Sequence, residues 1–532
     1  MNADQKVISL AQTIRDAGGR ALLVGGCVRD ALMGAQPKDW DLEVYHLDPV
    51  RLREILDHFG PVNVVGESFT VYKLGQHLDV SIPRRERKSG RGHKAFVIEG
   101  NPSMSVAEAT RRRDFTINAI LQDPLTGELI DPYEGRRDIE QRVLRAVSTE
   151  TFAEDSLRVL RAAQFAARFE FDIHPDTIAL CRSIDLDDLP AERIWGELEK
   201  LLLQAKRPSV GLEWLRKLGA VEKLFPEIQS LIDVPQDPEW HPEGDVFVHT
   251  QLVIDRAREL IDDLSYPRQV TVMLAALAHD FGKPATTEFI DGRLRSRGHE
   301  EAGVPATESF LDRINVHTID GYNVRAQVIA LVREHLKPGE FYKKRDEVGE
   351  GAFRRLARRC EPDLLYRVAK ADSLGRNAEW VPREQWYGSE AQEWFIQRTR
   401  ELEVEQRPPD PLLLGRHLLE LGVEPGPRMG EITRAVYEMQ LDGRVRSLDQ
   451  AIEEARGLLA TDDTDYTDQS VLIREICGCC WVTQWIVPMP QTRGSQLIGT
   501  IRRVGKNFWS VSTARASLTW PNTGARTTLL AI

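Results

Sequence analysis

Residues 22–44 read LLVGGCVRDALMGAQPKDWDLEV, and they say more about the fold than any other stretch of the chain. An apolar run ends in Gly25-Gly26, a polar segment follows, and then come Asp39 and Asp41, with one residue between them. Side chains of a strand alternate between its faces, so these two carboxylates would point the same way. Together they could hold one or two divalent cations. The glycines fall where a strand turns into a helix, and bare N–H groups there favour phosphates.

Each part of this pattern is common alone, since a single D-x-D or GG is usually a turn. The combination with Arg29 and Asp30 after the glycines is much rarer. It resembles the nucleotidyltransferases of the DNA-polymerase-beta superfamily. More narrowly, the chain resembles class II, bacterial-type tRNA nucleotidyltransferases (CCA-adding enzymes) and their poly(A) polymerase relatives. The resemblance spans residues 20–460 and implies template-independent addition of C, C and A to tRNA from CTP and ATP.

Two further motifs carry the same resemblance. The first, RRRDFTINAI at residues 111–120, places Arg113 beside Asp114. A guanidinium fork matches phosphate oxygens, so Arg113 is expected to bind phosphates and Asp114 to orient it. The second, EDSLRVLRAAQFAARF at residues 154–169, has helical periodicity, which predicts one helical face with three polar side chains: Asp155, Arg158 and Arg161.

The pair formed by Asp155 and Arg158 has two interpretations. The ordinary one is an intrahelical ion pair that contributes roughly 0.2–0.5 kcal/mol. The other is base selection: cytosine and adenine both present an amino donor beside a ring-nitrogen acceptor, which a carboxylate and an arginine complement. Guanine and uracil present the opposite pattern. The resemblance assigns base reading to these two residues, and Arg161 is expected to bind nucleotide as well.

The resemblance also implies a metal-assisted reaction. Asp39 and Asp41 are expected to hold Mg²⁺, a hard cation that prefers carboxylate and phosphate oxygens. Asp79, in the segment HLDVSIPRRE, is a candidate third carboxylate, or else it pairs with Arg84 or Arg85. The triphosphate is expected to contact Gly25, Gly26, Arg29 and Arg113.

A second group of candidate ligands lies later in the chain. FVHTQLVIDRA contains His249, ALAHDFGKP contains His279 and Asp280, and ADSLGR contains Asp372. H…HD…D is typical of HD-type metal phosphohydrolases, and imidazole with carboxylate suits divalent transition metals. His299 and His335 are candidates for a second metal position. The alternative is a structural cluster of hydrogen-bonded histidines.

A chain of 532 residues is too long for a single core, and its patterns predict several domains. The fold class expected is an α/β head with a mixed, DNA-polymerase-beta-like sheet, followed by mostly helical neck, body, HD and tail domains. The predicted boundaries are a head at 1–140, a helical neck and body at 141–232, an HD domain at 233–404, a helical tail contacting tRNA at 405–460 and a basic extension at 461–532. Disorder is one interpretation of that extension. Its Cys477, Cys479 and Cys480 lack a second Cys/His pair, so they do not favour a metal site.

Composition sets the remaining expectations. The net charge of −12 argues against a nucleic-acid partner, but basic residues cluster at 84–94, 111–113 and 354–359. No apolar window is long enough for a membrane span, and six cysteines do not form a disulfide framework, so a cytoplasmic protein without a membrane partner is expected. Oligomeric state does not follow from the sequence.

Three alternatives remain beside full CCA addition. The head could add only CC or only A, or it could be a poly(A) polymerase. Poly(A) polymerases tend to have an arginine-rich stretch after the D-x-D, which residues 65–74, VGESFTVYKL, lack. The third alternative is an HD phosphohydrolase whose head is an inactive RNA-binding domain.

Overall fold

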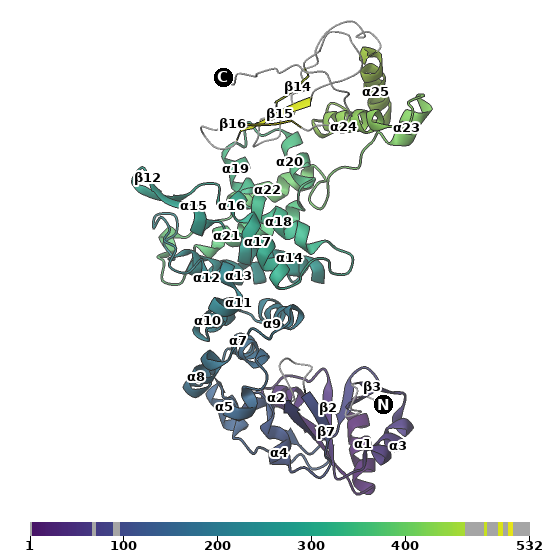
Figure 1. Cartoon of the computed structure of the whole chain (residues 1–532), viewed down its shortest axis with the longest axis vertical. Coiled ribbons are helices and arrows are strands. Elements are labelled where there is room, and N and C mark those ends of the chain that lie inside the picture. Colours follow the sequence, from purple (N-terminus) through teal and green to yellow (C-terminus); the bar gives the residue numbers. More distant parts are fainter. Residues whose placement is uncertain are drawn as a thin grey trace, which may run out of the picture. The chain divides into compact units, whose positions relative to one another are not determined.

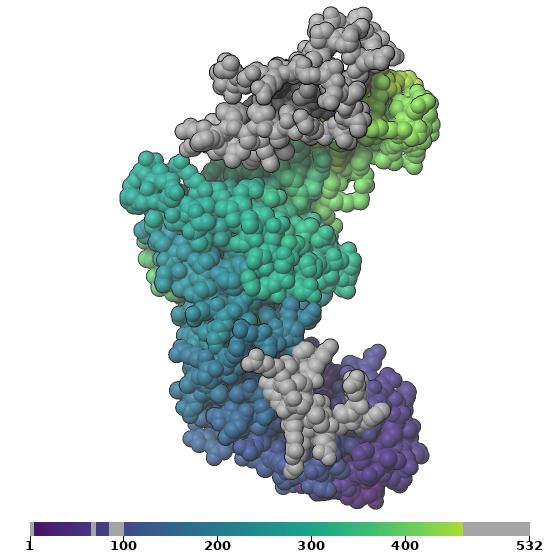
Figure 2. Space-filling model, in the orientation of Figure 1, coloured from purple at the N-terminus to yellow at the C-terminus, as the bar shows by residue number. Residues whose placement is uncertain are grey.

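The computed structural model describes residues 3–65, 71–88 and 96–462, and three short strands beyond them at 483–486, 498–503 and 509–513. The chain forms two compact units, Met1–Asp410 and Pro411–Ile532, each of which is considered by itself (Figure 1). Residues that are not described are grey in Figure 2. Residues 66–70, residues 89–95 and most of the predicted basic extension, with its three cysteines, lie outside the described residues.

The first unit begins with a mixed seven-stranded sheet in the order β3-β4-β5-β2-β1-β8-β9. Strands β2 and β5 pair in parallel, and the other neighbours pair antiparallel. This agrees with the mixed α/β head expected from the sequence. The strands are β1 (Arg20–Val24), β2 (Trp40–Tyr45), β3 (Val62–Val65), β4 (Val71–Leu74), β5 (Leu78–Ser81), β8 (Leu121–Gln122) and β9 (Leu129–Ile130), and a separate hairpin joins β6 (Arg84–Lys88) to β7 (Phe96–Gly100).

The two faces of the sheet differ because strand side chains alternate. In β2, Leu42 and Val44 pack into the core under helices α1 (Ala3–Asp16) and α3 (Pro49–Phe59), which lie beside the strands in Figure 1. Asp41 and Glu43 therefore point to the opposite face. The other short helices of the head are α2 (Gly26–Leu32), α4 (Val106–Arg111), the 3-10 turn η1 (Thr116–Asn118) and α5 (Gly135–Gln141).

Helices dominate the rest of this unit. The neck and body contain α6 (Thr149–Phe152), α7 (Leu157–Phe169), α8 (Pro175–Ser183), α9 (Ala191–Gln204), α10 (Pro208–Lys217), α11 (Ala220–Leu224) and α12 (Pro226–Gln229), with a parallel pair of β10 (Val143–Leu144) and β11 (Asp172–Ile173). The following region contains α13 (Val246–Arg258), α14 (Tyr266–Ala278), α15 (Lys283–Thr286), α16 (His299–Ala302), α17 (Val304–Arg313), α18 (Val324–Glu334), α19 (Lys337–Lys343), α20 (Glu350–Ala357), α21 (Pro362–Gly375), η2 (Arg383–Gln385) and α22 (Glu390–Glu401), with a hairpin of β12 (Thr287–Ile290) and β13 (Arg293–Ser296).

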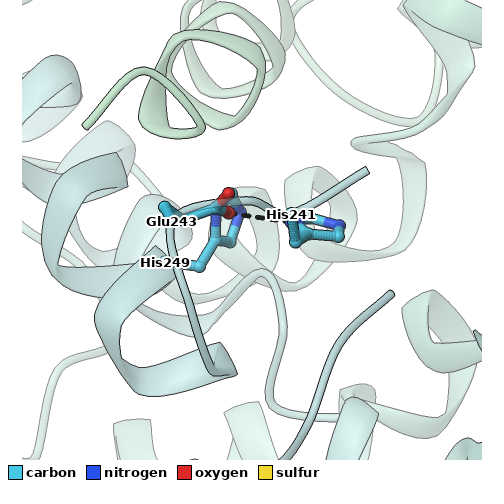
Figure 3. A group of neighbouring side chains, drawn as sticks. All are labelled: His241, Glu243 and His249. Atoms are coloured by element: carbon cyan, nitrogen blue, oxygen red, sulfur yellow. Dashed lines mark hydrogen bonds and ion pairs between the residues drawn. The ribbon is translucent and has the colours of Figure 1, made fainter. Parts of the chain in front are cut away.

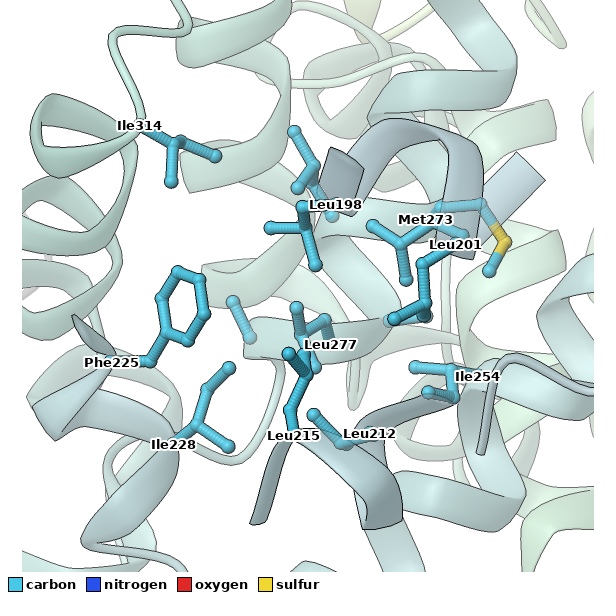
Figure 4. Packing of buried hydrophobic residues seen from close by; sticks show 14 of the residues in the cluster. Leu198, Leu201, Leu212, Leu215, Phe225, Ile228, Ile254, Met273, Leu277 and Ile314 are labelled. Carbon is cyan, nitrogen blue, oxygen red and sulfur yellow. The ribbon is translucent and has the colours of Figure 1, made fainter. Parts of the chain in front are cut away.

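One hydrophobic core runs through this helical part. Leu198 and Leu201 of α9 and Leu212 and Leu215 of α10 belong to the same cluster as Met273 of α14 (Figure 4). The predicted boundary at residue 232 therefore does not separate two cores, and the proposed division into domains stays a prediction. Burial of such side chains is worth about 1.5–3 kcal/mol each, so this continuous core holds the neck to the region that follows it.

The second unit has its own small core. Helices α23 (Gly415–Glu420), α24 (Pro427–Leu441) and α25 (Leu448–Asp462) bury Leu418, Val436 and Ala451. Strands β14 (Thr483–Ile486), β15 (Ile498–Arg503) and β16 (Trp509–Thr513) pair antiparallel.

Candidate functional site

A cleft of about 400 Å³ opens on the polar face of the head sheet. One side consists of strand residues, among them Asp41, Glu43 and Asp79. The other side comes from the neck and from the segment after α4, and it supplies a set of charged side chains: Arg112, Arg113, Asp114, Asp155, Arg158, Arg161 and Arg193. The cleft thus places carboxylates of the sheet opposite several arginines, which is the charge pattern that a metal-bound polyphosphate requires.

The carboxylates of Asp41 and Asp79 are neighbours because β2 and β5 pair in parallel with these two residues in register. Loss of hydration raises the pKa of Asp41 above its ordinary value, the charge of Arg113 opposes this rise, and the charges of Asp79 and Asp39 add to it. Asp79 also lies 3.4 Å from the ammonium of Lys73. Repulsion among these carboxylates is what a bound divalent cation would relieve.

Asp39 is less well placed than Asp41 to bind a cation in the cleft. It precedes β2, its side chain is 71% exposed, and its Oδ1 lies 2.9 Å from Nδ1 of His77. It is not among the residues that line the cleft. Its expected role as a metal ligand stays a prediction, whereas Asp41 and Asp79 face the cleft together.

Gly25, at the strand–helix turn of the first motif, lies beside Arg113 of the RRRDFTINAI motif. Gly25 caps α2 at φ 73°, a left-handed backbone conformation that favours glycine. A Cβ atom built on it would lie 2.9 Å from Nη1 of Arg113 and 4.0 Å from Oδ2 of Asp41. Close approach of the Arg113 guanidinium to the strand–helix turn therefore depends on the missing side chain. Gly26, in contrast, is the first residue of α2, and a Cβ there would meet only Nη2 of Arg29, at 3.6 Å.

Asp114 orients a different arginine from the one expected. Its carboxylate accepts hydrogen bonds from Arg161 Nε at 2.8 Å, from the Asn118 amide at 2.9 Å and from the Phe115 N–H at 2.8 Å. Burial alone would raise the pKa of Asp114, but the Arg161 charge and these donors outweigh it and hold the pKa below its ordinary value. The prediction that Asp114 orients Arg113 is therefore wrong; it anchors Arg161, at 47 residues' separation.

Arg29 is buried rather than presented to the cleft. Its guanidinium donates to Asp30 at 2.6 Å and to the side-chain oxygen of Asn118 at 2.7 Å. It also lies over the rings of Phe169 and Phe165, at 4.6 and 5.2 Å from their centroids. These contacts tie α2 to α7, so Arg29 supports the cleft wall, and its expected contact with triphosphate stays a prediction.

Asp155 and Arg158 both line the cleft, but they do not share one helical face. Helix α7 begins at Leu157, so Asp155 precedes it and accepts from the Leu157 N–H at 3.2 Å. The carboxylate of Asp155 pairs with Arg193 of α9 at 3.0 Å. Arg158 donates to the backbone carbonyls of Thr151 and Arg112 at 2.5 Å each, which fixes its guanidinium at the cleft.

The second group of predicted residues is brought together between α13, α14, α16, α18 and α21. His249 Nε2 lies 3.1 Å from Asp372 Oδ1 and 3.8 Å from Asp280 Oδ2. His279 Nε2 lies 3.1 Å from Asp280 Oδ2, and His299 Nε2 lies 3.3 Å from Asp280 Oδ1. All six predicted side chains are buried, and their ligand atoms include the triplets His249–His279–Asp372 and Asp280–His299–His335, each within 4.8 Å.

Three of these histidines are oriented in the same way. The Nδ1 atoms of His279, His299 and His335 lie 2.8, 2.7 and 2.6 Å from the backbone carbonyls of Ala276, Ser296 and Val332, each three residues earlier. A carbonyl can only accept, so each Nδ1 carries the proton and each Nε2 keeps its lone pair. The Nε2 atoms of His299 and His335 face each other at 3.2 Å. Two lone pairs this close repel unless a cation lies between or beside them.

The chemistry of this cluster fits a divalent transition metal. Burial lowers the pKa of His335 to about 3, which keeps it in the neutral form that binds metals. Although burial opposes ionisation, contacts with His279 and with the ammonium of Lys283 hold the pKa of Asp280 well below its usual range. His279 Nε2 and Asp280 Oδ2 are buried and make no hydrogen bond of good geometry among the described residues, although Lys283 Nζ lies 2.7 Å from Asp280 Oδ2. Neutral imidazoles and ionised carboxylates with unsatisfied atoms are the donor set such metals use.

A cavity of about 210 Å³ gives access to this cluster. Asp280, His299, His335 and Asp372 form one part of its lining. Its remaining polar lining includes two cations and several uncharged groups that sequence reasoning did not select: Gln236, Trp240, His241, Lys283 and Arg376.

Three family models match the chain in succession. They are the poly A polymerase head domain at residues 21–145, the probable RNA and SrmB-binding site of polymerase A at 170–232 and the HD domain at 246–377. A multifunctional CCA protein of Xanthomonas campestris is 39% identical over 377 residues, which cover 68% of this chain and 87% of that protein. The chain belongs to the multifunctional CCA protein family. A member from Xylella fastidiosa is 37% identical over 370 residues, 67% of this chain and 84% of its own length.

Solved structures share the fold of this multifunctional CCA protein family member. A CCA-adding enzyme in complex with CTP superposes with a TM-score of 0.56 at 20% identity, over 86% of this chain and 95% of that chain. The Bacillus stearothermophilus CCA-adding enzyme in complex with CTP gives 0.56 at 19% identity, over 87% of this chain and all of that one. No helix within the described residues has the length and apolar character needed to span a membrane.

Two residues that line the cleft of this family member, Glu43 and Arg193, were not predicted from the sequence. Glu43 is buried, accepts from the Tyr45 hydroxyl at 2.6 Å and pairs with Arg112 at 3.3 Å. The sequence could have indicated Glu43, because a residue two positions after Asp41 lies on the same face of the strand. Arg193, the partner of Asp155, had no local signal, since 38 residues separate them.

Proposed function

We propose that this protein adds C, C and A to the 3′ end of tRNA, using CTP and ATP, in the cleft of its head. The observation that carries this proposal is the pairing of Asp41 with Asp79 on one wall of the cleft, opposite an arginine-rich second wall. Curated relatives of the same family bear the name multifunctional CCA protein, and a structural neighbour, the Thermotoga maritima CCA-adding enzyme, is complexed with tRNA.

Asp41 and Asp79 are the residues best placed to hold Mg²⁺, and Asp39 stays a third candidate. When bound, Mg²⁺ would activate the 3′-hydroxyl of tRNA and neutralise charge on the departing pyrophosphate. Arg113 would bind the triphosphate beside the turn at Gly25. Among the described residues, no carboxylate lies within ion-pair distance of Arg113, so its guanidinium is available to phosphate.

Base choice is assigned to Asp155 and Arg158. Arg158 is held at the cleft by two backbone carbonyls, which leaves its orientation fixed before nucleotide binds. Each carboxylate oxygen of Asp155 can accept more than one hydrogen bond, so its bonds to Arg193 and to the Leu157 N–H leave capacity for an amino group of the base. Cytosine and adenine offer that amino group beside a ring-nitrogen acceptor. Arg161, held by Asp114, completes the nucleotide-binding wall.

Purified protein and three tRNAs would test this proposal. The tRNAs end at the discriminator base, at C and at CC, and each is offered CTP, ATP or both. Extension of all three to CCA is the expected result. Extension of only one or two would indicate a CC-only or A-only enzyme, and runs of adenosine on unrelated RNA would indicate a poly(A) polymerase. No extension at all would favour an inactive, RNA-binding head.

We propose a second activity, metal-dependent phosphohydrolysis, for the HD region. The specific support is the set of buried imidazoles that present Nε2 to Asp280 and Asp372 beside a cavity containing Lys283 and Arg376. A divalent transition metal would supply an activated water, and the two cations of the cavity would bind a phosphate. His249, His279 and Asp372 would hold one metal, and His299, His335 and Asp280 could hold a second.

Reconstitution tests this second activity. The chain is stripped with a chelator, reloaded with individual divalent transition metals and assayed on phosphomonoesters and cyclic phosphodiesters. Activity that returns with metal in the wild type and stays absent in Asp280→Asn is expected. A metal-independent activity, or one that Asp280→Asn retains, would point to a structural cluster instead. A cytoplasmic location fits a tRNA substrate and remains part of this proposal.

A further inference from the structure

We propose that Glu243 is a positioning residue of the HD metal centre, which holds His249 in the orientation that presents Nε2 to the metal. The inference rests on the proposed metal-dependent function of that centre. It concerns a residue outside the H…HD…D pattern, contributed by the Pro-rich segment that precedes α13.

Glu243 is a buried carboxylate between two imidazoles. Its side chain is 0% exposed, and its Oε1 lies 2.7 Å from Nδ1 of His249 and 2.9 Å from Nδ1 of His241. Figure 3 shows the carboxylate between the two rings. The indole N–H of Trp380 donates to the backbone carbonyl of Glu243 at 3.1 Å, which anchors the segment. Burial of a carboxylate costs folding free energy unless the group is paired, so the position of Glu243 needs an explanation.

By distance alone, His241, Glu243 and His249 could form a metal site of their own. The position of His249 argues against that. Its other nitrogen, Nε2, faces Asp372 at 3.1 Å and Asp280 at 3.8 Å, within the ligand set of the HD centre. An imidazole that coordinates metal through Nε2 carries its proton on Nδ1, and a protonated nitrogen donates rather than coordinates. The carboxylate of Glu243 therefore faces the Nδ1–H of His249 at 2.7 Å and does not share a metal with it.

His249 differs from the other three histidines in this respect. They use backbone carbonyls at Nδ1, whereas His249 uses a charged side chain. Nδ1 of His249 has no partner of good hydrogen-bond geometry among the described residues, and its short contact with Glu243 is bent. Electrostatic attraction to the Glu243 carboxylate therefore orients the His249 ring. A carboxylate at this position also makes the imidazole a stronger metal ligand than a carbonyl does.

Cobalt binding to the full-length, metal-stripped protein tests the inference. Co²⁺ is titrated into the wild type, Glu243→Gln and Glu243→Ala, and both the dissociation constant and the visible absorption of bound Co²⁺ are recorded. We expect Glu243→Ala to weaken binding by about 10- to 100-fold. Glu243→Gln, which keeps the shape and loses the charge, is expected to weaken binding less and to shift the absorption band at saturating Co²⁺.

A control variant separates positioning from general damage. Glu227→Gln removes another buried carboxylate of the same unit, which accepts from Ser309 at 2.7 Å and Arg313 at 3.0 Å away from the metal cluster. This control is expected to bind Co²⁺ as the wild type does, with an unchanged absorption band.

The outcomes distinguish this inference from the proposal on which it rests. Wild-type binding of Co²⁺ together with unchanged affinity and spectrum in Glu243→Gln and Glu243→Ala would overturn the role of Glu243 and leave the metal centre standing. Failure of the wild type to bind Co²⁺ would overturn both. Addition of nucleotides to tRNA by the head reports whether each variant is folded, and if Glu243→Ala does not fold, the affinity and spectrum of Glu243→Gln decide.

Discussion

Replacement of Gly25 by alanine is expected to slow nucleotide addition while leaving the protein folded. The new Cβ would lie 2.9 Å from Nη1 of Arg113, a distance that Cβ atoms essentially never show to a non-bonded neighbour. The clashing atom is the far end of a flexible side chain, so Arg113 can move away. It must shift by about half an ångström to reach ordinary van der Waals contact.

The size of the effect follows from two terms. Alanine at φ 73° and ψ −129° is strained, which costs about 1–3 kcal/mol of folding free energy. Displacement of a positioning group by 1 Å can cost about 100-fold in rate, so half that shift in Arg113 predicts a fall in kcat of about tenfold. The KM for CTP is expected to change less, because the remaining arginines of the cleft are not displaced.

Steady-state extension of a tRNA ending at the discriminator base measures kcat and KM, and denaturant unfolding measures the stability loss. Gly26→Ala is the matched control, since its Cβ would meet only Arg29 Nη2, at an ordinary 3.6 Å. That variant is expected to keep the wild-type rate. A folded Gly25→Ala protein with wild-type kcat would refute the view that Arg113 acts beside the turn.

Further predictions address the cleft and its supports. Asp155→Ala is expected to raise incorporation of G and U relative to C and A more than it raises the KM for triphosphate; an unchanged base preference in competition assays would remove Asp155 from base reading. Asp39→Ala combined with Asp41→Ala is expected to abolish nucleotide addition and to spare HD hydrolysis, and loss of both activities would show that the two sites are not independent. Asp114→Asn is expected to lose about 2 kcal/mol of unfolding free energy at neutral pH, because it breaks a largely buried ion pair whose Arg161 is partly exposed. The folded-state pKa of Asp114 is lowered, so its stabilisation is present above the unfolded pKa of about 3.9 and disappears as pH falls through the folded value. Urea unfolding at a series of pH values should therefore show the two proteins converging in acid, and a constant difference would contradict the assignment.

The sequence predicted the head well because strand periodicity and turn glycines are local signals. Short apolar runs of the sequence at 21–24, 62–65 and 78–82 correspond to β1, β3 and β5. The alternation in β2, with Leu42 buried and Asp41 at the cleft, followed directly from the two-residue period. Family models and relatives then bore out the nucleotidyltransferase and HD assignments.

Long-range pairing is what the sequence could not supply. Asp114 was assigned to its neighbour Arg113, but the fold brings Arg161 against it across 47 residues. Asp155 was placed on a helix that begins two residues later, because a helical period does not mark its own first residue. Glu243 was missed although it lies only six residues before His249, since nothing in H-P-E-G-D shows which imidazole nitrogen a carboxylate faces.

The central claim is that the cleft containing Asp41 and Asp79 builds the sequence CCA on tRNA. The most direct measurement offers the wild type and Asp41→Asn a tRNA that ends at the discriminator base, with all four NTPs present, and sequences the 3′ ends produced. Ends that read C, C, A and stop in the wild type, and unextended ends in Asp41→Asn, are the predicted result. Unextended tRNA or runs of a single nucleotide in the wild type, or complete CCA ends in Asp41→Asn, would contradict the account.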